Sequence, residues 1–346
     1  MDKKRVLIVF GGCSSEHEVS LQSAHAVLSH LDTEHFEVVP VGITAEGKWF
    51  YFAHGWQGLL NGGWETCCVP CTLSLDRSRR GLLLLDGSGQ CLPLDAVFPI
   101  LHGRNGEDGT IQGACELAGL PVIGCGTLSS ALCMDKERAH RLVEAAGIRV
   151  PKSKVFASNA PRAEMEAAAK SIGFPLFAKP LRAGSSFGAS RVECIQQLSG
   201  ALDNASAFDN EMILEEAIPG FEVGCAVIGC GELTVGAIDE VELETGFFDY
   251  EEKYTLKSAK IHCPARISSH QAAQIQQAAK TVYRALNCRV MARVDLFLTP
   301  EGEIVFNEVN TIPGFTAHSR FPTMMCAGGL TFSELITRLI ELGVQA

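Results

Sequence analysis

Residues 291–310, MARVDLFLTPEGEIVFNEVN, form the stretch whose geometry follows most directly from the sequence. Met291–Leu298 and Glu303–Asn307 predict two strands. Thr299–Gly302 between them has Pro in its second position and Gly in its fourth, which favours a type I turn. The stretch therefore predicts a β-hairpin.

Side-chain alternation along this hairpin predicts a polar patch. If Leu298 pairs with Glu303 across the turn, the register brings four polar side chains to one face: Arg293, Asp295, Glu308 and Asn310. In that register Arg293 lies opposite Glu308. Three of the four side chains offer the hard oxygen ligands that Mg²⁺ prefers when phosphates complete its shell. A solvated sheet face with a cross-strand salt bridge is equally supported by the spacing, and the tight loop Asn310–Gly314 that follows favours a site.

A Gly/Ser-rich loop follows another predicted strand. Phe174–Lys179 reads as this strand and Arg182–Gly188 as the loop, whose small residues free backbone N–H groups to wrap an anion. The loop lacks the Gly-Lys-Ser/Thr ending of a P-loop, and such segments are more often only turns. By itself the segment gives weak support for a phosphate site.

Two more polar residues stand at strand ends, where α/β sheets place their ligands. Glu16 lies shortly after the strand Val6–Phe10 and is suited to hold an ammonium group, whereas a dinucleotide fingerprint would need a third glycine in place of Ser15. His102 follows the strand Ala96–Leu101 in a glycine-rich loop. A surface carboxylate and a structural histidine are the plain alternatives for these two residues.

Short apolar strands alternate with amphipathic helical stretches, which predicts an α/β protein. The first region should hold a largely parallel sheet with the strands Val6–Phe10, Val38–Ile43 and Ala96–Leu101. Residues 44–93 read as an irregular insertion with one strand, Gly81–Asp86.

Helix signals organise the rest of the chain. Helical spacing of apolar residues predicts helices over Asp135–Ala146 and Gln271–Leu286. Thr331 and Glu334 have the spacing of a capping box at the start of a closing helix. With Met212–Glu216 read as a strand, we expect three domains: residues 1–124, 125–214 and 215–346.

Composition excludes several classes of function. Hydrophobic residues make up 47% and charged residues 20%, which is typical of globular proteins and not of disorder. A formal net charge of −11 without a long basic stripe excludes nucleic acid as a partner. No stretch is apolar enough to span a bilayer, and Val6–Phe10 is too short for a signal peptide, so we expect a cytoplasmic protein without a membrane partner. The 14 scattered cysteines read as reduced thiols.

Seven segments together resemble the D-alanine–D-alanine ligase family of ATP-grasp enzymes, over almost the whole chain: Gly11–Ser20, Leu101–Gly103, Gly106–Gly109, Met134–Lys136, Lys179–Pro180, Gly184–Ser186 and Glu308–Gly314. The resemblance implies an ATP-grasp fold of three α/β domains, with ATP between the central and C-terminal domains. It implies a ligase that forms a D-alanyl-D-amino acid dipeptide through a D-alanyl phosphate, for peptidoglycan precursor synthesis. ATP, two Mg²⁺ ions with Mn²⁺ as a substitute, and a homodimer are implied as well.

The resemblance also assigns roles to residues. Nucleotide contacts are implied at six positions: Lys136 and Lys179 at the phosphates, Ser185 and Ser186 in the phosphate loop, Glu215 on the adenine side and Glu222 at the ribose. Three residues would hold the Mg²⁺ ions: Asp295, Glu308 and Asn310.

The amino acids would be held by a second set of residues. Glu16 would bind the ammonium group of the first D-alanine, and Arg293 would stabilise the tetrahedral oxyanion. The resemblance implies further members of this set: Ser319 and Lys253 at the second carboxylate, Tyr254 in a hydrogen-bonded network with Ser185 and Glu16, and His102 in the Leu101–Gly103 motif. Residues 244–262 resemble the family's mobile lid, which would keep water from the acyl phosphate.

Two positions resemble the VanG and VanC type of D-alanine–D-serine ligases. These are Phe248 and Arg320, and Asp239 is a candidate partner for the Arg320 guanidinium. They favour D-serine as the second substrate, with a second D-alanine as the alternative and D-lactate third. The biological role is then either vancomycin resistance or ordinary cell-wall synthesis.

Other classes of protein explain less of the sequence. An NAD-binding dehydrogenase would account for Gly11 and Gly12 but lacks the third glycine. A non-catalytic amino-acid-binding protein would account for several domains, but not for Asp295, Glu308 and Asn310 together.

Overall fold

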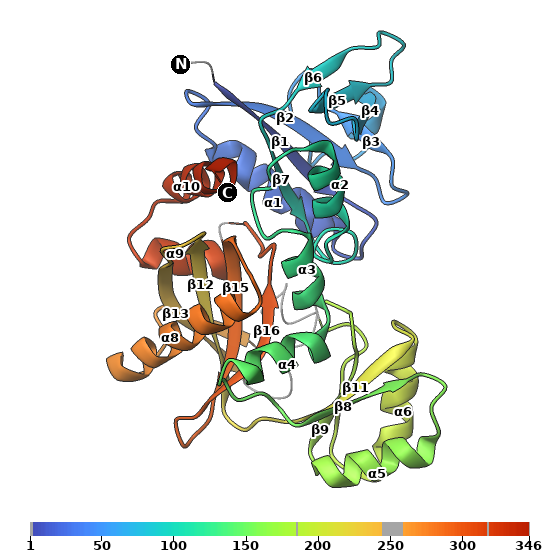
Figure 1. Ribbon diagram of the computed structural model, residues 1–346, viewed down its shortest axis with the longest axis vertical. Coiled ribbons are helices and arrows are strands. Elements are labelled where there is room, and N and C mark those ends of the chain that lie inside the picture. The colour runs from blue at the N-terminus through green and yellow to red at the C-terminus, as the bar shows by residue number, and fades with distance from the viewer. Residues whose placement is uncertain (1–2, 185, 244–258, 317, 346) are drawn as a thin grey trace.

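Three β-sheets, each covered by helices, build the protein (Figure 1). The computed structural model describes residues 3–184, 186–243, 259–316 and 318–345. The strands of the three sheets come from residues 4–101, 153–216 and 221–310. The α/β class predicted from alternating strands and helices is confirmed.

The first sheet has a parallel centre. It consists of β1 (Lys4–Gly11), flanked by β2 (Phe36–Ile43) and β7 (Ala96–Leu101). Val6–Phe10 is fully buried in β1, which explains its continuous apolar run, since a central parallel strand is covered on both faces. The helices of this unit are α1 (His17–His30) and α2 (Thr110–Ala118), and α3 (Thr127–Met134) leads on from α2 toward the second sheet's region.

The prediction of a largely parallel first sheet is wrong, and so is that of an irregular insertion, within which only the predicted strand at Gly81–Asp86 is confirmed. Residues 49–93 extend the sheet as an antiparallel meander: β3 (Trp49–Tyr51), β4 (Val69–Leu73), β5 (Gly81–Leu84) and β6 (Cys91–Pro93), with a short 3-10 helix at Trp64–Cys67. These strands are only three to five residues long. Short strands carry too few alternating positions to be recognised in a single sequence.

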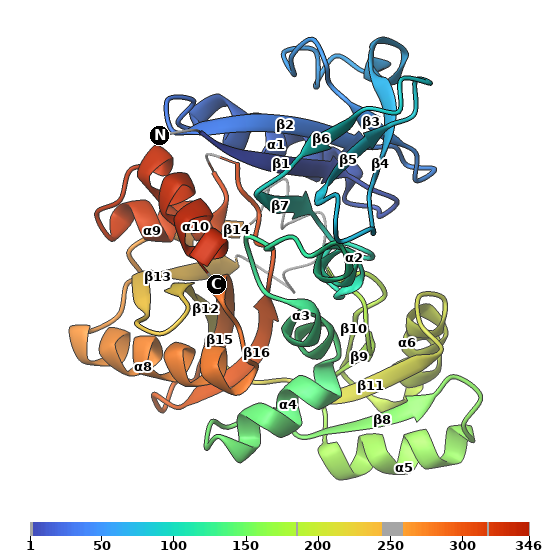
Figure 2. The same cartoon turned by 45° about the horizontal axis from the view of Figure 1, so that its top comes forward.

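The second sheet is antiparallel, in the order β10-β9-β11-β8. Its strands are β8 (Ser153–Ala157), β9 (Leu176–Pro180), β10 (Ser190–Val192) and β11 (Glu211–Glu216). Helices α5 (Arg162–Ile172) and α6 (Ile195–Ser206) cover one of its faces (Figure 2). The predicted strands around Phe174–Lys179 and Met212–Glu216 are confirmed, as is the helix at Asp135–Ala146, which is α4 (Lys136–Ala145).

The third sheet has the order β14-β13-β12-β15-β16 and carries helices on both faces. Its strands are β12 (Phe221–Gly229), β13 (Thr234–Leu243), β14 (Ala259–His262), β15 (Val290–Leu298) and β16 (Ile304–Asn310). Alternate residues of β12, such as Val223 and Cys225, pack with the predicted helix α8 (Ser269–Ala285). The residues between them, such as Gly224 and Ala226, face the helix α9 (Arg320–Ala327).

The predicted hairpin is present, but its predicted register is wrong. Leu298 pairs with Ile304, and a β-bulge then shifts the register so that Asp295 lies opposite Glu308 and Arg293 opposite Asn310. A bulge adds one residue to one strand, and the sequence around it did not allow its position to be predicted. The four predicted polar residues still share one face of the sheet. The bulge changes which residue lies opposite which, but all four side chains stay on the same side.

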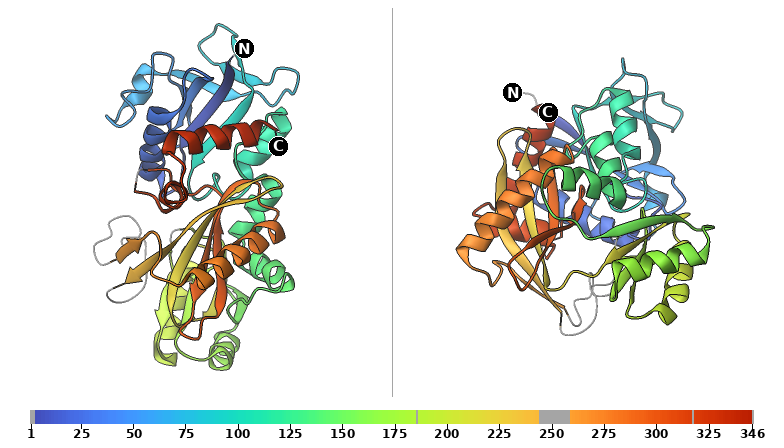
Figure 3. Two further views of the ribbon diagram at one scale, coloured as in Figure 1. Left: turned by 90° about the vertical axis from the view of Figure 1, so that its left-hand side faces the viewer. Right: turned by 60° about the horizontal axis from the view of Figure 1, so that its bottom comes forward.

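The C-terminal helix returns to the first sheet. In α10 (Phe332–Gln345), Leu335, Ile336, Leu339 and Ile340 are fully buried in a cluster that includes residues of β1 and α1. Figure 3 shows this red helix beside the blue strands. The predicted capping box is confirmed, since Thr331 and Glu334 exchange hydrogen bonds between side chain and backbone. Within the described ranges, no helix has the length and apolar character needed to cross a membrane.

Candidate active site

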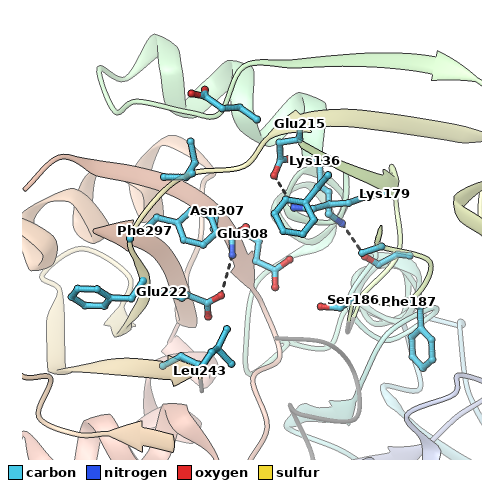
Figure 4. A pocket seen from close by; sticks show the side chains of 18 of the residues that line it. Lys136, Lys179, Ser186, Phe187, Glu215, Glu222, Leu243, Phe297, Asn307 and Glu308 are labelled. Carbon is cyan, nitrogen blue, oxygen red and sulfur yellow. Dashed lines mark hydrogen bonds and ion pairs between the residues drawn. The ribbon is translucent and has the colours of Figure 1, made fainter. Parts of the chain in front are cut away.

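Two cavities adjoin over the third sheet. The larger cavity, of about 430 Å³, lies between the second and third sheets and is lined by polar and charged residues (Figure 4): Lys136, Lys179, Ser186, Glu215, Glu222 and Glu308. The smaller cavity, of about 310 Å³, lies between the first unit and the third sheet, with another polar set: Glu16, His102, Glu107, Arg293, Ser319 and Arg320. Lys136 and Glu308 line both cavities, so ligands in the two would meet at these residues.

A row of carboxylates crosses the third sheet beside the cavities. Gly224 of β12 pairs with Asp239 of β13 on one side and with Asp295 of β15 on the other. Asp295 in turn pairs with Glu308 of β16. The row is therefore fixed by strand register and does not depend on loop conformation.

Gly224 leaves the space in which these side chains meet. A Cβ atom there would lie 2.5 Å from the Arg320 guanidinium, 2.5 Å from the Asp239 carboxylate and 3.1 Å from that of Asp295. The Gly224 backbone N–H donates to Asp239 Oδ1 at 2.8 Å. Glycine is required here for close approach, because a side chain would occupy the place of the ion pairs.

Arg320, at the start of α9, lies over Gly224 and is almost fully buried. Its Nε and Nη2 atoms donate to Asp239 at 2.7 and 2.9 Å, so the predicted pairing of these residues is present. Nη1 lies 2.5 Å from Glu222 Oε1, and Nη2 lies 3.5 Å from Asp295 Oδ1. Burial opposes the charge, but these carboxylates outweigh it and raise the pKa of Arg320 well above its usual value.

Arg293 and Asn310, which pair with each other across β15 and β16, both hydrogen-bond to the Asp295 carboxylate. Arg293 Nε and Nη2 donate to Asp295 at 2.9 and 2.8 Å, and Asn310 Nδ2 donates to Asp295 Oδ2 at 2.9 Å. Burial works against the Arg293 charge, yet Asp295 keeps the pKa of the guanidinium above its usual value. Three residues of the predicted patch, Arg293, Asp295 and Asn310, are thus connected by hydrogen bonds beside the cavities, and Glu308 lies opposite Asp295 on the next strand.

The donor set at this place fits a divalent cation. Around Gly224, four carboxylates face two guanidiniums, which leaves a surplus of two negative charges: Glu222, Asp239, Asp295 and Glu308 against Arg293 and Arg320. The oxygens of Asp295, Glu308 and Asn310 are the hard ligands that Mg²⁺ prefers. Among the described residues, no three His, Cys, Asp or Glu side chains are already arranged around one metal position. Because Asp295 already accepts from Arg293, its carboxylate would have to be shared between Arg293 and the ion.

A second buried ion pair lies in the larger cavity. Lys179 Nζ contacts Glu215 Oε1 at 2.7 Å, and His140 Nε2 lies 3.9 Å from the other carboxylate oxygen. Burial alone would raise the pKa of Glu215, but Lys179 and then His140 lower it, so the carboxylate is charged. Burial lowers the pKa of His140. No sequence pattern pointed to His140, which lies on the buried face of α4 and reads as an ordinary helix residue.

Lys136 is placed by the helix start that the sequence predicted. Asp135 caps α4, since its side chain accepts a hydrogen bond from the Arg138 backbone N–H at 3.0 Å. Lys136 is therefore the first residue of the helix, and its Nζ donates to the Ala183 carbonyl at 2.9 Å. This contact brings the lysine to the Gly/Ser-rich loop predicted to bind phosphate.

His102 joins the first unit to the loop after β16. The Ile312 carbonyl can only accept, so His102 Nδ1 carries the proton of their 3.1 Å hydrogen bond. Nε2 then accepts from the Ser23 hydroxyl at 3.2 Å, while Ser23 Oγ accepts from the Phe315 N–H at 3.3 Å. Burial lowers the pKa of His102, which suits this neutral tautomer. Both ring nitrogens are engaged, so the histidine orients the wall of the smaller cavity.

Glu107 is a site residue that the sequence reasoning did not single out, although it stands in the quoted Gly106–Gly109 motif. It lines the smaller cavity with Glu16, and its Oε2 accepts from the Gly103 N–H at 2.9 Å. Burial, followed by the negative charge of Glu16, raises the pKa of Glu107 to about 8. Its place in the Gly106–Gly109 motif was the signal available in the sequence.

Ser319 lines the smaller cavity directly before α9, and its hydroxyl accepts from the Thr316 N–H at 3.0 Å. The other predicted residues lie outside the part of the chain that the structure describes: Ser185, Phe248, Lys253 and Tyr254. Of the predicted lid, residues 259–262 are described and form β14.

Comparisons with known proteins agree on one family. The family models described as "D-ala D-ala ligase N-terminus" and "D-ala D-ala ligase C-terminus" match residues 5–125 and 142–341. A crystal structure of the VanG D-Ala:D-Ser ligase from Enterococcus faecalis matches with a TM-score of 0.92 and 53% identity over 99% of both chains. The vancomycin B-type resistance protein VanB of Enterococcus faecalis is 42% identical over the full length of both proteins. A putative D-alanine–D-lactate ligase of Streptomyces coelicolor is also 42% identical, over 99% of each.

Proposed function

The chain belongs to the D-alanine–D-alanine ligase family of ATP-dependent ligases, and from this premise we propose that it joins D-alanine to D-serine. ATP would occupy the larger cavity, and the two amino acids the smaller one. The observation that carries D-serine is Arg320, a charged donor that lines the smaller cavity and is oriented by Asp239. The 53% identity to a protein described as a D-Ala:D-Ser ligase supports the same assignment.

Activation of the first D-alanine uses the residues where the cavities meet. Lys136 and Lys179 would bind the phosphates of ATP while a carboxylate oxygen of D-alanine attacks the terminal phosphorus and ADP leaves. Asp295, Glu308 and Asn310 would hold two Mg²⁺ ions, which supply positive charge to the transferred phosphoryl group. Glu308 lines both cavities, as a residue serving both phosphate and acceptor carboxylate must.

Dipeptide formation follows in the smaller cavity. Glu16 would hold the ammonium group of the D-alanyl phosphate, and Ser319 the carboxylate of the second amino acid. The amine of D-serine then attacks the acyl carbon, Arg293 stabilises the oxyanion, and inorganic phosphate leaves as the peptide bond forms. The Arg293 guanidinium is fixed by Asp295, so little reorganisation is needed when charge develops.

Substrate choice depends on how the smaller cavity treats one hydroxyl group. A pocket that only tolerates a hydroxyl discriminates weakly, whereas one that hydrogen-bonds it rejects the analogue that lacks it. Asp239 is completely buried and does not line the cavity, so its role would be to aim Arg320. Formation of D-alanyl-D-alanine is the second candidate, favoured by the family's own name.

The remaining organisation follows the family. We take residues 1–124, 125–214 and 215–346 as the three domains, and a homodimer as the assembly. The second boundary passes near the end of β11, whose last residue is Glu216.

The test of this function is a comparison of kcat/KM for D-serine and D-alanine as second substrate in the wild type and in Arg320→Leu, by phosphate release from Mg-ATP. We expect the substitution to lower kcat/KM for D-serine more than for D-alanine. Equal losses for both amino acids would show that Arg320 supports the fold or the chemistry without selecting D-serine.

A further inference from the structure

One ion pair connects a residue of the larger cavity with a residue of the smaller one. Glu222 lines the larger cavity, where Figure 4 shows its carboxylate beside Asn307, and Arg320 lines the smaller cavity. Arg320 Nη1 and Glu222 Oε1 are 2.5 Å apart. The side chain of Arg320 is 7% exposed and that of Glu222 is 14% exposed, so water screens this contact weakly.

The far side of the guanidinium is fixed. Asp239 is fully buried and binds Nε and Nη2, while the guanidinium already fills the space over Gly224, where a Cβ atom would lie 2.5 Å from Nη2. Nη1 is therefore the nitrogen whose partner can change. In the structure that partner is Glu222.

We infer that Arg320 is the residue through which the nucleotide and the second amino acid influence each other's binding. A nucleotide whose hydroxyl groups donate to Glu222 would compete with Arg320 for that carboxylate. Nη1 would then be released toward the smaller cavity, where it can meet the amino acid. The inference deepens the proposed function, since it rests on a nucleotide in the larger cavity and an amino acid in the smaller one.

The direction of the effect follows from this exchange of partners. Nucleotide binding should tighten amino-acid binding, and by thermodynamic linkage the amino acid must tighten nucleotide binding by the same factor. Such couplings are commonly about 5-fold to 150-fold. Neutralising Glu222 should weaken its hold on Arg320 and release Nη1 even without nucleotide, because a neutral amide is a poorer partner for a guanidinium than a carboxylate.

Glu222→Gln and Glu240→Gln form a matched pair of variants. Glu240 also lines the larger cavity and also pairs with an arginine, since Arg266 Nη2 lies 2.6 Å from Glu240 Oε1. Arg266 is half-exposed and does not line the smaller cavity. Both variants change a carboxylate of the larger cavity, but only Glu222→Gln changes the link to the smaller one.

The experiment is calorimetric titration of the full-length protein with the β,γ-imido analogue of ATP and Mg²⁺, alone and with saturating D-serine, and again with saturating D-alanine. In the wild type and in Glu240→Gln, the amino acid should tighten analogue binding by about 5-fold or more. In Glu222→Gln the factor should fall to less than about twofold. A direct titration should show that nucleotide-free Glu222→Gln binds D-serine more tightly than the nucleotide-free wild type does.

The two amino acids separate this inference from the choice of second substrate. A coupling that appears with D-alanine alone and is lost in Glu222→Gln would support the link and contradict the D-serine assignment. An unchanged coupling factor in Glu222→Gln, or no coupling in a wild-type protein that releases phosphate from Mg-ATP, would overturn the inference and leave the ligase function standing. Weaker D-serine binding by nucleotide-free Glu222→Gln would also contradict it.

Discussion

Arg320 binds Asp239 through two nitrogens, at 2.7 and 2.9 Å, beside the smaller cavity. The pair is buried, and its carboxylate partners raise the pKa of Arg320 well above its usual value, which favours the charged guanidinium. Removing one partner of such a pair commonly costs about 3 to 5 kcal/mol, because the other charge is left unpaired. Variants of Arg320 therefore need a check of folding beside every kinetic measurement.

The close packing of Arg320 and Asp239 over Gly224 predicts that a larger residue at position 224 lowers the stability of the protein. Gly224→Ala would place Cβ 2.5 Å from both Arg320 and Asp239. We expect the free energy of unfolding to fall by about 1 to 3 kcal/mol, as overpacking usually costs, and substrate selectivity to weaken as the ion pair is displaced. Urea denaturation measures the first effect. Gly200→Ala is the control, since its Cβ would meet nothing within 4 Å and α6 should gain up to about 1 kcal/mol. Equal stability of the Gly224→Ala variant and the wild type would contradict the close approach.

Glu308→Gln tests the site where the two cavities meet. The substitution removes one negative charge from the proposed Mg²⁺ ligands, so turnover at saturating Mg²⁺ should fall by roughly two to three orders of magnitude. The circular dichroism spectrum should be unchanged, because Glu308 lies near the end of an edge strand. Near-normal ligation by the purified variant would rule out this assignment.

Glu16→Gln tests the site of the first amino acid. Glu16 lines the smaller cavity and not the larger one, so the KM for the first D-alanine should rise much more than the KM for ATP. Initial rates with each substrate varied in turn measure the two constants. Similar changes in both constants would assign Glu16 a general structural role.

The raised pKa of Glu107 predicts that the stability of the protein depends on pH. Its pKa is raised to about 8 in the folded protein from an ordinary value of 4.5, so the folded state binds more protons than the unfolded state between these pH values. The contribution of Glu107 to stability therefore falls as pH rises from about 5 to about 8. Glu107→Gln removes this titration, and its melting temperature relative to the wild type should increase over that interval. A constant difference between the two proteins from pH 5 to pH 9 would contradict the raised pKa.

Local signals in the sequence were enough to predict much of the fold. Apolar spacing located α4 and α8, and Thr331 and Glu334 gave the start of the closing helix. These local signals could not show that α10 packs against the first sheet. The apolar face of an amphipathic helix predicts that the face is buried, but not which element buries it. Of the short strands, β5 was expected at Gly81–Asp86, whereas β3, β4 and β6 were missed for lack of periodicity.

The site was predictable where residues are linked by strand alternation and less so where tertiary contacts join distant elements. Arg293 and Asn310 were expected on one face, and the bulge changed only which residue each faces. The contact between Arg320 and Glu222 spans 98 residues and has no local signal. The need for glycine at position 224 likewise appears only when α9 and three strands are placed together.

The central claim is the choice of D-serine, and a competition experiment tests it most directly. The enzyme is given Mg-ATP and D-alanine with equal concentrations of D-serine and D-lactate at neutral pH, and the products are quantified by mass. We predict that D-alanyl-D-serine predominates, with less D-alanyl-D-alanine and little D-alanyl-D-lactate. Predominance of D-alanyl-D-alanine would contradict the D-serine assignment and leave the family assignment unchanged.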